Sequence, residues 1–248
     1  MSKRQKKIIT LAAAFALMFG IVPNVSAMHI MEGYLPGAFC IAWGVLCVPF
    51  LIAGFMSIKK TISQNRKLIT LLAMSGAFIF VISSLKIPSV TGSCSHMTGT
   101  GLGAILFGPA SVSILGIIVL LFQAILLAHG GLTTLGANVF SMAIAGPFVS
   151  YGIYFVCKKT GVNKRVSVFL AATIGDLFTY CVTAVQMAIA HHADTTIFGA
   201  MGKFLAVFAP TQVPLAIIEG IITVVIVMGL ESYAKPELRA VGFLKEAK

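Results

Sequence analysis

The sequence predicts an all-α polytopic membrane protein, a bundle of about seven transmembrane helices with one irregular Gly/Ser-rich loop. Hydrophobic residues make up 58% of the 248 residues and charged ones only 10%, and the mean hydropathy is +0.99. No soluble domain of this length buries so much apolar surface, so the solvent must be lipid. The apolar segments run approximately over 36–58, 67–87, 101–128, 131–157, 165–190 and 197–231. In lipid such segments satisfy their backbone polar groups internally, as helices.

Residues 1–27 are predicted to be a cleavable signal peptide. Four basic residues within the first seven precede an apolar run from Ile8 to Val22, which Pro23 ends. The small residues Val25-Ser26-Ala27 then stand where a signal peptidase cuts. The alternative is an uncleaved first transmembrane helix, but the run is shorter than the roughly 20 residues that a bilayer core requires. Residues 28–248 would then form a single transmembrane helical domain.

The basic loops set the expected orientation in a cell membrane. Loops 59–67 and 158–165 are basic, as is the C-terminal tail, and such segments prefer the cytoplasm. With Met28 outside, both loops lie inside only if one extra crossing, short or broken, occurs between about 88 and 130. We therefore expect seven segments and a cytoplasmic C-terminus; the alternative has six, with 88–108 as an external loop. The net charge of +11 is explained by this anchoring, and no basic stripe points to nucleic acid.

Region 88–104 is small, polar and rich in glycine, and it contains His96. Irregular backbone at membrane depth is tolerated only where it is buried in protein or lines a cavity. In either topology this region opens toward the outer side, where Met28 also lies. Two chemically informative segments, this loop and the start of the mature chain, are thus expected on one face.

The predicted mature N-terminus offers nitrogen ligands for a metal ion. Met28 would supply a free α-amine, and His29 a deprotonated backbone amide and the imidazole Nδ1. His96 is the leading candidate for a fourth nitrogen. Four nitrogens in a plane suit Ni(II), Cu(II) or low-spin Co(II), whereas Zn(II) prefers a tetrahedron and Mg(II) or Ca(II) oxygen ligands. Both imidazoles must be neutral to bind, so the affinity should fall in acid.

Other polar groups carry weaker expectations. His129 stands at a helix end, where an imidazole often caps carbonyl groups. Lys86, Asp176 and Glu219 lie in or near predicted spans, where each is expected to pair inside the bundle or to lie near an interface, although intramembrane charges are also candidates for function. Four amide side chains are expected to form interhelical hydrogen bonds, namely Gln123, Asn138, Gln186 and Gln212.

The sequence lacks the motifs of an ATPase or of the common enzyme classes. There is no G-x-x-x-x-G-K-[ST] loop, since Gly202-Lys203 is followed by Phe204. There is also no H-E-x-x-H, nucleophile elbow or C-x-x-C-H haem site. We expect a transporter component rather than an enzyme, with ATP hydrolysis in a separate subunit. A membrane metalloprotein or haem redox protein is a remote alternative.

Three motifs resemble those of one family, the CbiM and NikM proteins, which are substrate-binding membrane components of energy-coupling factor transporters for cobalt and nickel. The motifs are Met28–Pro36, Lys86–His96 and Leu126–Asn138. The resemblance covers essentially the whole mature chain and is strongest to the cobalt form.

The resemblance implies a ligand set made of the Met28 amine, the His29 backbone and side chain, and His96. It also implies seven helices and three partners: a small membrane subunit (CbiN), a membrane coupling subunit (CbiQ) and an ATPase (CbiO). The transported substrate would be Co(II), taken up for cobalamin synthesis. Ni(II) remains the alternative, because both ions accept a planar nitrogen set.

Overall fold

The computed structural model describes residues 29–88, 94–192 and 195–244. The predicted signal peptide and Met28 lie outside these residues. The described elements are α2 (Gly37–Gln64), α3 (Leu68–Ser84), β1 (Ile87–Pro88), β2 (Cys94–Ser95), α4 (Thr100–Phe107), α5 (Pro109–Leu127), α6 (Leu135–Asn138), the π-helix η2 (Val139–Ala145), α7 (Gly146–Lys159), α8 (Lys164–Ala190), α9 (Ile197–Tyr233) and α10 (Lys235–Ala240). The all-α prediction is confirmed; the two strands, antiparallel to each other, have two residues each.

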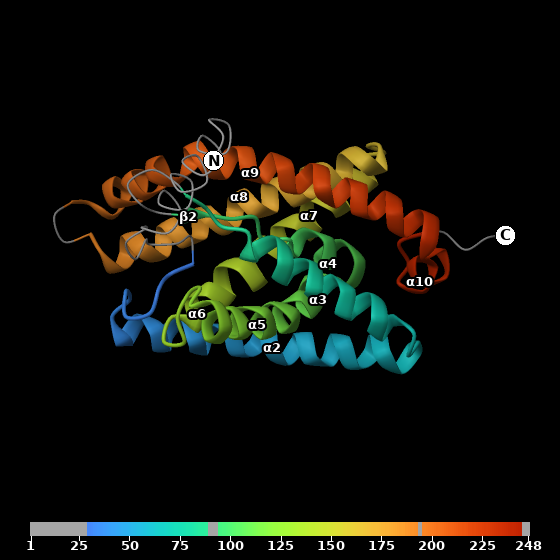
Figure 1. Ribbon diagram of the computed structural model, residues 1–248, viewed down its shortest axis with the longest axis horizontal. Helices are drawn as coiled ribbons and strands as arrows, with labels where there is room; N and C mark the ends of the chain where they lie inside the picture. Colours follow the sequence, from blue (N-terminus) through green and yellow to red (C-terminus); the bar gives the residue numbers. More distant parts are fainter. Residues whose placement is uncertain (1–28, 89–93, 193–194, 245–248) are drawn as a thin grey trace, which may run out of the picture.

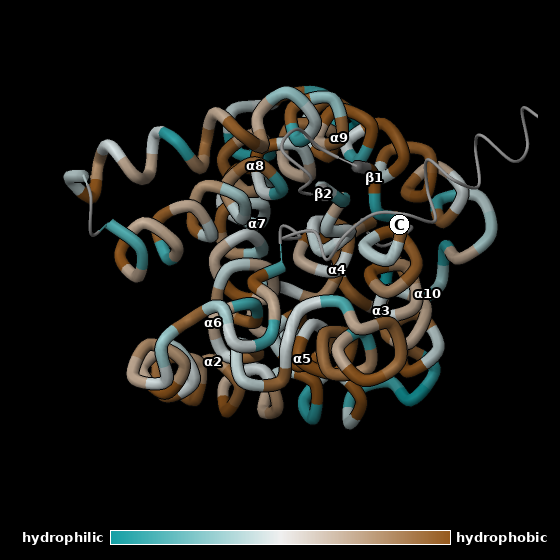
Figure 2. Tube along the Cα trace, turned by 60° about the vertical axis from the view of Figure 1, so that its left-hand side comes forward, coloured by the Kyte–Doolittle hydropathy of each residue, from teal (hydrophilic) through white to brown (hydrophobic). Residues whose placement is uncertain are grey.

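Within the described part of the chain, five helical segments are long and apolar enough to cross a membrane. They are α2, α5, the continuous run from α6 to α7 (Leu135–Lys159), α8 and α9, while α3 is apolar but has only 17 residues. Hydrophobic residues extend along the helices, and hydrophilic ones gather mostly in the turns (Figure 2). Many large apolar side chains are exposed, Ile41 and Phe55 on α2 among them. This outward apolar surface is what a lipid environment requires.

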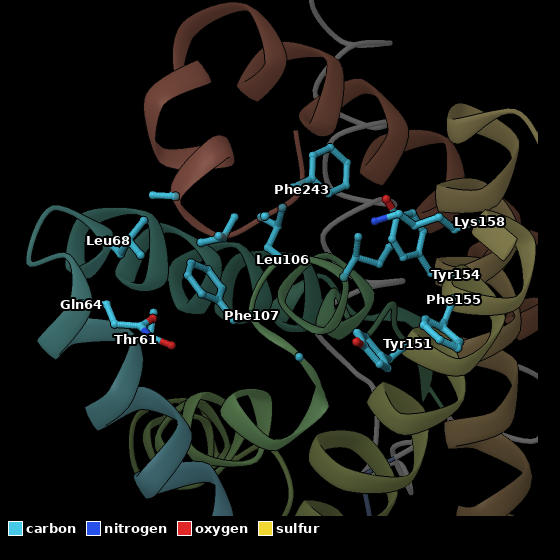
Figure 3. A pocket seen from close by; sticks show the side chains of 15 residues that line it. Thr61, Gln64, Leu68, Leu106, Phe107, Tyr151, Tyr154, Phe155, Lys158 and Phe243 are labelled. Atoms are coloured by element: carbon cyan, nitrogen blue, oxygen red, sulfur yellow. The ribbon is translucent and has the colours of Figure 1, made fainter. Parts of the chain in front are cut away.

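The segment between about 88 and 130, where the sequence predicts an extra crossing, contains the short helix α4. All of its residues except Phe107 are buried, and at Gly108 (φ +82°) and Pro109 the chain turns into α5. The α4–α5 corner and the α2–α3 turn line one cavity of about 330 Å³ together with Lys158 and α10 (Figure 3). The alternative that takes all of 88–108 as a loop is wrong, because residues 100–107 form the buried helix α4, whose end lies with the basic loops.

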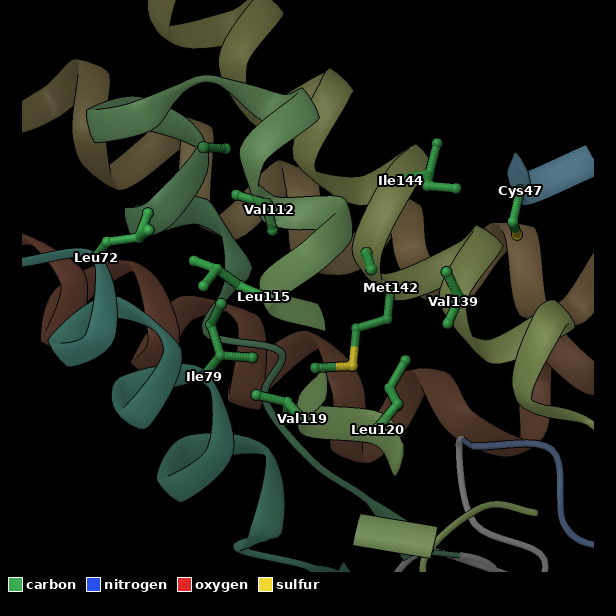
Figure 4. Close-up of a cluster of buried hydrophobic side chains, with 12 residues drawn as sticks. Cys47, Leu72, Ile79, Val112, Leu115, Val119, Leu120, Val139, Met142 and Ile144 are labelled. Atoms are coloured by element: carbon green, nitrogen blue, oxygen red, sulfur yellow. The ribbon is translucent and has the colours of Figure 1, made fainter. Parts of the chain in front are cut away.

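The bundle core lies between α2, α3, α5 and η2. Buried apolar side chains from these elements form one cluster, which includes Ile79, Val112, Leu120 and Met142 (Figure 4). Helices α5 and η2 approach closely, since a Cβ added to Gly116 would lie 2.3 Å from the Cβ of Ala143. Figure 1 shows α6 and β2 toward one end of this bundle and α10 at the other. The core therefore lies between two ends of the bundle, one with α6 and β2 and the other with α10. His29, His96 and His129 lie at the end with α6 and β2.

Candidate metal centre

His29 and His96 meet inside the bundle although 67 positions separate them. The His29 Nδ1 lies 2.5 Å from the His96 Nε2, and the side chains are 3% and 0% exposed. Two nitrogens bound about 2.0 Å from one metal ion at a right angle would be about 2.8 Å apart. The two atoms that the sequence predicts as ligands thus face each other at the spacing of neighbouring ligands.

Burial keeps both imidazoles neutral. Desolvation is the main cause that lowers the pKa of His96 to about 4, and the same cause lowers the pKa of His29 well below its usual value. Only the neutral ring has a free lone pair for a metal ion. The pair is therefore in its binding form throughout the physiological pH range.

A buried amide side chain holds the backbone next to His29. The Asn138 Oδ1 accepts a hydrogen bond from the Ile30 N–H (2.8 Å), and the Asn138 Nδ2 donates one to the Ile30 carbonyl (3.0 Å). Thr134 donates to the same carbonyl at 2.6 Å. Asn138 ends α6 and is followed directly by η2, a π-helix of the kind often found at functional sites. Asn138 and Thr134 thus hold the backbone at Ile30 in a fixed position beside α6.

Glu32 ties the same segment to the loop that follows His129. Its carboxylate accepts hydrogen bonds from the backbone N–H groups of Leu132 (2.5 Å) and Thr133 (3.2 Å). Hydrogen bonding to Thr133 is the largest cause that lowers the pKa of Glu32. At Gly131 the approach is so close that a Cβ would lie 2.5 Å from the Glu32 backbone. No larger residue fits there, so the glycine is required by packing.

The loop that carries His96 is held by α9 and, through it, by α8. The Gln212 Nε2 donates to the His96 carbonyl (3.1 Å) and to the Asp176 Oδ2 (2.6 Å). Glu219 accepts from the backbone N–H of Thr98 (2.6 Å) and from its hydroxyl (3.0 Å). Both carboxyl groups are 1% exposed. Asp176 and Glu219 thus each have a polar partner inside the bundle, as expected, and these partners, Gln212 and Thr98, hold the loop of the candidate ligand.

The other predicted amide contacts are also present. Gln123 donates to Ser83 on α3 (2.7 Å), and Gln186 donates to the Ala137 carbonyl (3.1 Å). Gln123, Gln186 and Gln212 thus bond between helices, as the sequence predicts, whereas Asn138 bonds the non-helical segment at Ile30.

His129 joins the site, and the interpretation of its ring as a helix cap is wrong. Its backbone N–H donates to the Gln123 carbonyl, but neither ring nitrogen has a hydrogen-bond partner among the described residues. The ring is 1% exposed, with its centroid 4.4 Å from that of His29 and 4.8 Å from that of His96. The ligand nitrogens of the three histidines all lie within 4.8 Å of one another. The structure thus presents three neutral imidazoles in one buried cluster, next to the backbone that follows Met28.

Known proteins match most of this chain. The family described as "Cobalt uptake substrate-specific transmembrane region" matches residues 29–238. The protein named cobalt transport protein CbiM in Lachnoclostridium phytofermentans is 71% identical over 245 residues, 98% of each chain. The protein of the same name in Ruminiclostridium cellulolyticum is 57% identical over 236 residues, 95% of each chain.

Solved structures share the fold. One, titled as a truncated transition metal transporter, superposes with a TM-score of 0.73 at 28% identity and covers 83% of this chain and 99% of its own. Another, titled as a transition metal transporter, gives 0.72 at 30% identity, with 82% and 92% covered. The matched region includes His29, His96 and His129 in the family comparison, so the buried cluster lies within the part that relatives share.

Proposed function

Because this chain belongs to the CbiM family of cobalt uptake substrate-specific transmembrane regions, we propose that it captures Co(II) for an ATP-driven importer of the energy-coupling factor type. The ion is held by the Met28 amine, the His29 backbone nitrogen and Nδ1, and the His96 Nε2. The observation that carries this proposal is the 2.5 Å approach of the His29 Nδ1 to the His96 Nε2 in a buried, neutral site.

Removal of residues 1–27 completes the ligand set. Cleavage after Ala27 creates the α-amine of Met28, which together with the two His29 nitrogens closes chelate rings around one ion. Support comes from the anchoring of Ile30 by Asn138, because it fixes the backbone immediately after the proposed amide ligand. A planar set of four nitrogens suits low-spin Co(II) and equally Ni(II), so a nickel importer of the same family is the second candidate.

The cargo enters from the outer face and leaves toward the cytoplasm, where it serves cobalamin synthesis. The basic loops at the end opposite the histidines support this orientation, since such loops stay in the cytoplasm. The chain has no phosphate-binding loop of the G-x-x-x-x-G-K-[ST] type. ATP hydrolysis is therefore assigned to a CbiO-type subunit, coupled through CbiQ-type and CbiN-type membrane subunits.

Cobalt uptake into cells that express the chain with these three partners tests the proposal. His29→Ala and His96→Ala should each abolish uptake, because each removes one imidazole nitrogen from the set of four. His192→Ala is the matched control: the ring of this exposed histidine contacts the Ile189 carbonyl near the end of α8 (3.0 Å), far from the proposed ligands in the sequence, and its loss should leave uptake unchanged. Wild-type uptake by His96→Ala, at equal protein level in the membrane, would refute the proposal.

A further inference from the structure

We propose that His129 is a fifth, axial ligand of the captured Co(II), perpendicular to the plane of the other nitrogens. The inference rests on the proposed function and adds one ligand to that site. It begins from the placement of His129, which the sequence gives no reason to join with the other two histidines.

The packing of the three rings has the dimensions of imidazoles around one ion. A nitrogen about 2.0 Å from a metal places its ring centroid about 3.1 Å away, so two imidazoles at a right angle have centroids about 4.5 Å apart. The three centroid separations here are 4.4 Å, 4.4 Å and 4.8 Å, between His29 and His96, His29 and His129, and His96 and His129. With His29 and His96 as neighbours in the plane, the third mutually perpendicular position is the axial one.

The ring of His129 also lacks any other partner. It is 1% exposed, and both of its ring nitrogens are without a hydrogen bond in the described ranges. A buried polar group left unpaired destabilises the fold, and native structures avoid it unless the group has another use. A metal ion would satisfy one of these nitrogens. One of them already lies within 4.8 Å of the ligand nitrogens of His29 and His96.

The backbone conformation on both sides of His129 places this residue beside the other two histidines. Ala128 has φ +45°, a left-handed conformation that is uncommon outside glycine, and Gly130 has φ +80°. A Cβ on Gly130 would lie 3.1 Å from the Asn138 Nδ2 and 3.5 Å from the His29 Cδ2. The turn after α5 therefore brings the His129 backbone directly against the site.

An axial imidazole would discriminate between the two candidate metals. Low-spin Co(II) has a single electron in the orbital that points along the axis and binds a nitrogen there readily. In planar Ni(II) that orbital is filled, and an axial nitrogen is bound weakly or not at all. His129 would thus strengthen the binding of Co(II) over Ni(II) without any change in the planar set.

Electron paramagnetic resonance of the purified, processed protein loaded with Co(II) without oxygen tests the inference. Because ¹⁴N has a nuclear spin of one, a single axial nitrogen should split the high-field features into three lines. Labelling the histidines with ¹⁵N should change the three lines to two, which tests the wild-type chain without any variant. His129→Phe should remove the splitting, and His192→Phe, at an exposed site, should keep it.

Metal affinities give the second readout. His129→Phe should weaken Co(II) binding by about tenfold or more and Ni(II) binding by less than about threefold, and the retained Ni(II) binding shows that the variant is folded. Splitting that persists in His129→Phe, or wild-type Co(II) with no axial nitrogen, would overturn the inference and leave the proposed function intact. A wild-type chain that binds no Co(II), or that binds it equally after His96→Ala, would overturn both.

Discussion

The binding of one Co(II) near pH 6.5 should release about two protons. The Met28 amine, with an ordinary pKa of about 7.7–8.0, is mostly protonated at that pH and must lose its proton to bind. The His29 backbone amide loses another. His96 contributes none, because burial lowers its pKa to about 4, and the pKa of His29 is lowered for the same reason.

The sign and size of the pH dependence follow from this count. Two protons released per ion strengthen binding by about 100-fold for each unit by which the pH rises below the pKa of the amine. Protonation of His96 weakens binding only as the pH falls toward about 4, and burial lowers the pKa of His29 well below its usual value too. Between about pH 6 and 7 the dependence therefore reports the amine and the amide alone.

Calorimetric titration with Co(II) in two buffers of different ionisation enthalpy measures the released protons directly. A chain whose Met28 amine is acetylated is the control, because that nitrogen no longer has a lone pair for the ion, and it should lose most of its affinity. A proton count near zero, with an affinity that is flat between about pH 6 and 7, would show that neither the amine nor the backbone amide binds the ion. The site would then be made of imidazoles only.

Two side chains that hold the ligands give further predictions. Asn138→Ala leaves the buried Ile30 N–H without its acceptor, which costs about 1–3 kcal/mol, so Co(II) affinity should fall by about 5-fold to 150-fold. Asn65→Ala, at the opposite end of the bundle, where Asn65 bonds only locally, should leave the affinity unchanged. Gln212→Ala removes the donor to the His96 carbonyl, and stopped-flow measurements should show Co(II) dissociation faster by about tenfold; an unchanged rate would exclude a role for α9 in holding the loop.

The sequence predicted the helical segments well because their signal is local. Most long apolar runs became single helices close to their predicted bounds, whereas the run 101–128 became two, α4 and α5. The break within the segment 101–128 was less visible. Gly108 and Pro109 divide it into α4 and α5, and only the positive φ of Gly108 shows why the chain turns there.

The site was predicted in part. The meeting of His29 and His96 followed from chemistry and topology, because both segments were expected on one face. The place of His129 could not be predicted, since capping by a histidine at a helix end leaves the same pattern in the sequence. Gln212 and Glu219 were expected to bond within the bundle, but which backbone groups they would hold depends on how α9 packs against the loop of His96.

In the proposed site, proteolytic processing creates the amine that binds cobalt. Intact mass spectrometry of the protein purified from the membrane with its metal, under conditions that preserve the complex, tests this dependence on processing. We predict a chain that begins at Met28 and carries one Co(II), and no cobalt on any chain that keeps residues 1–27. Cobalt bound to a chain that still begins at Met1 would contradict the claim, because Met28 would then have no α-amine to give.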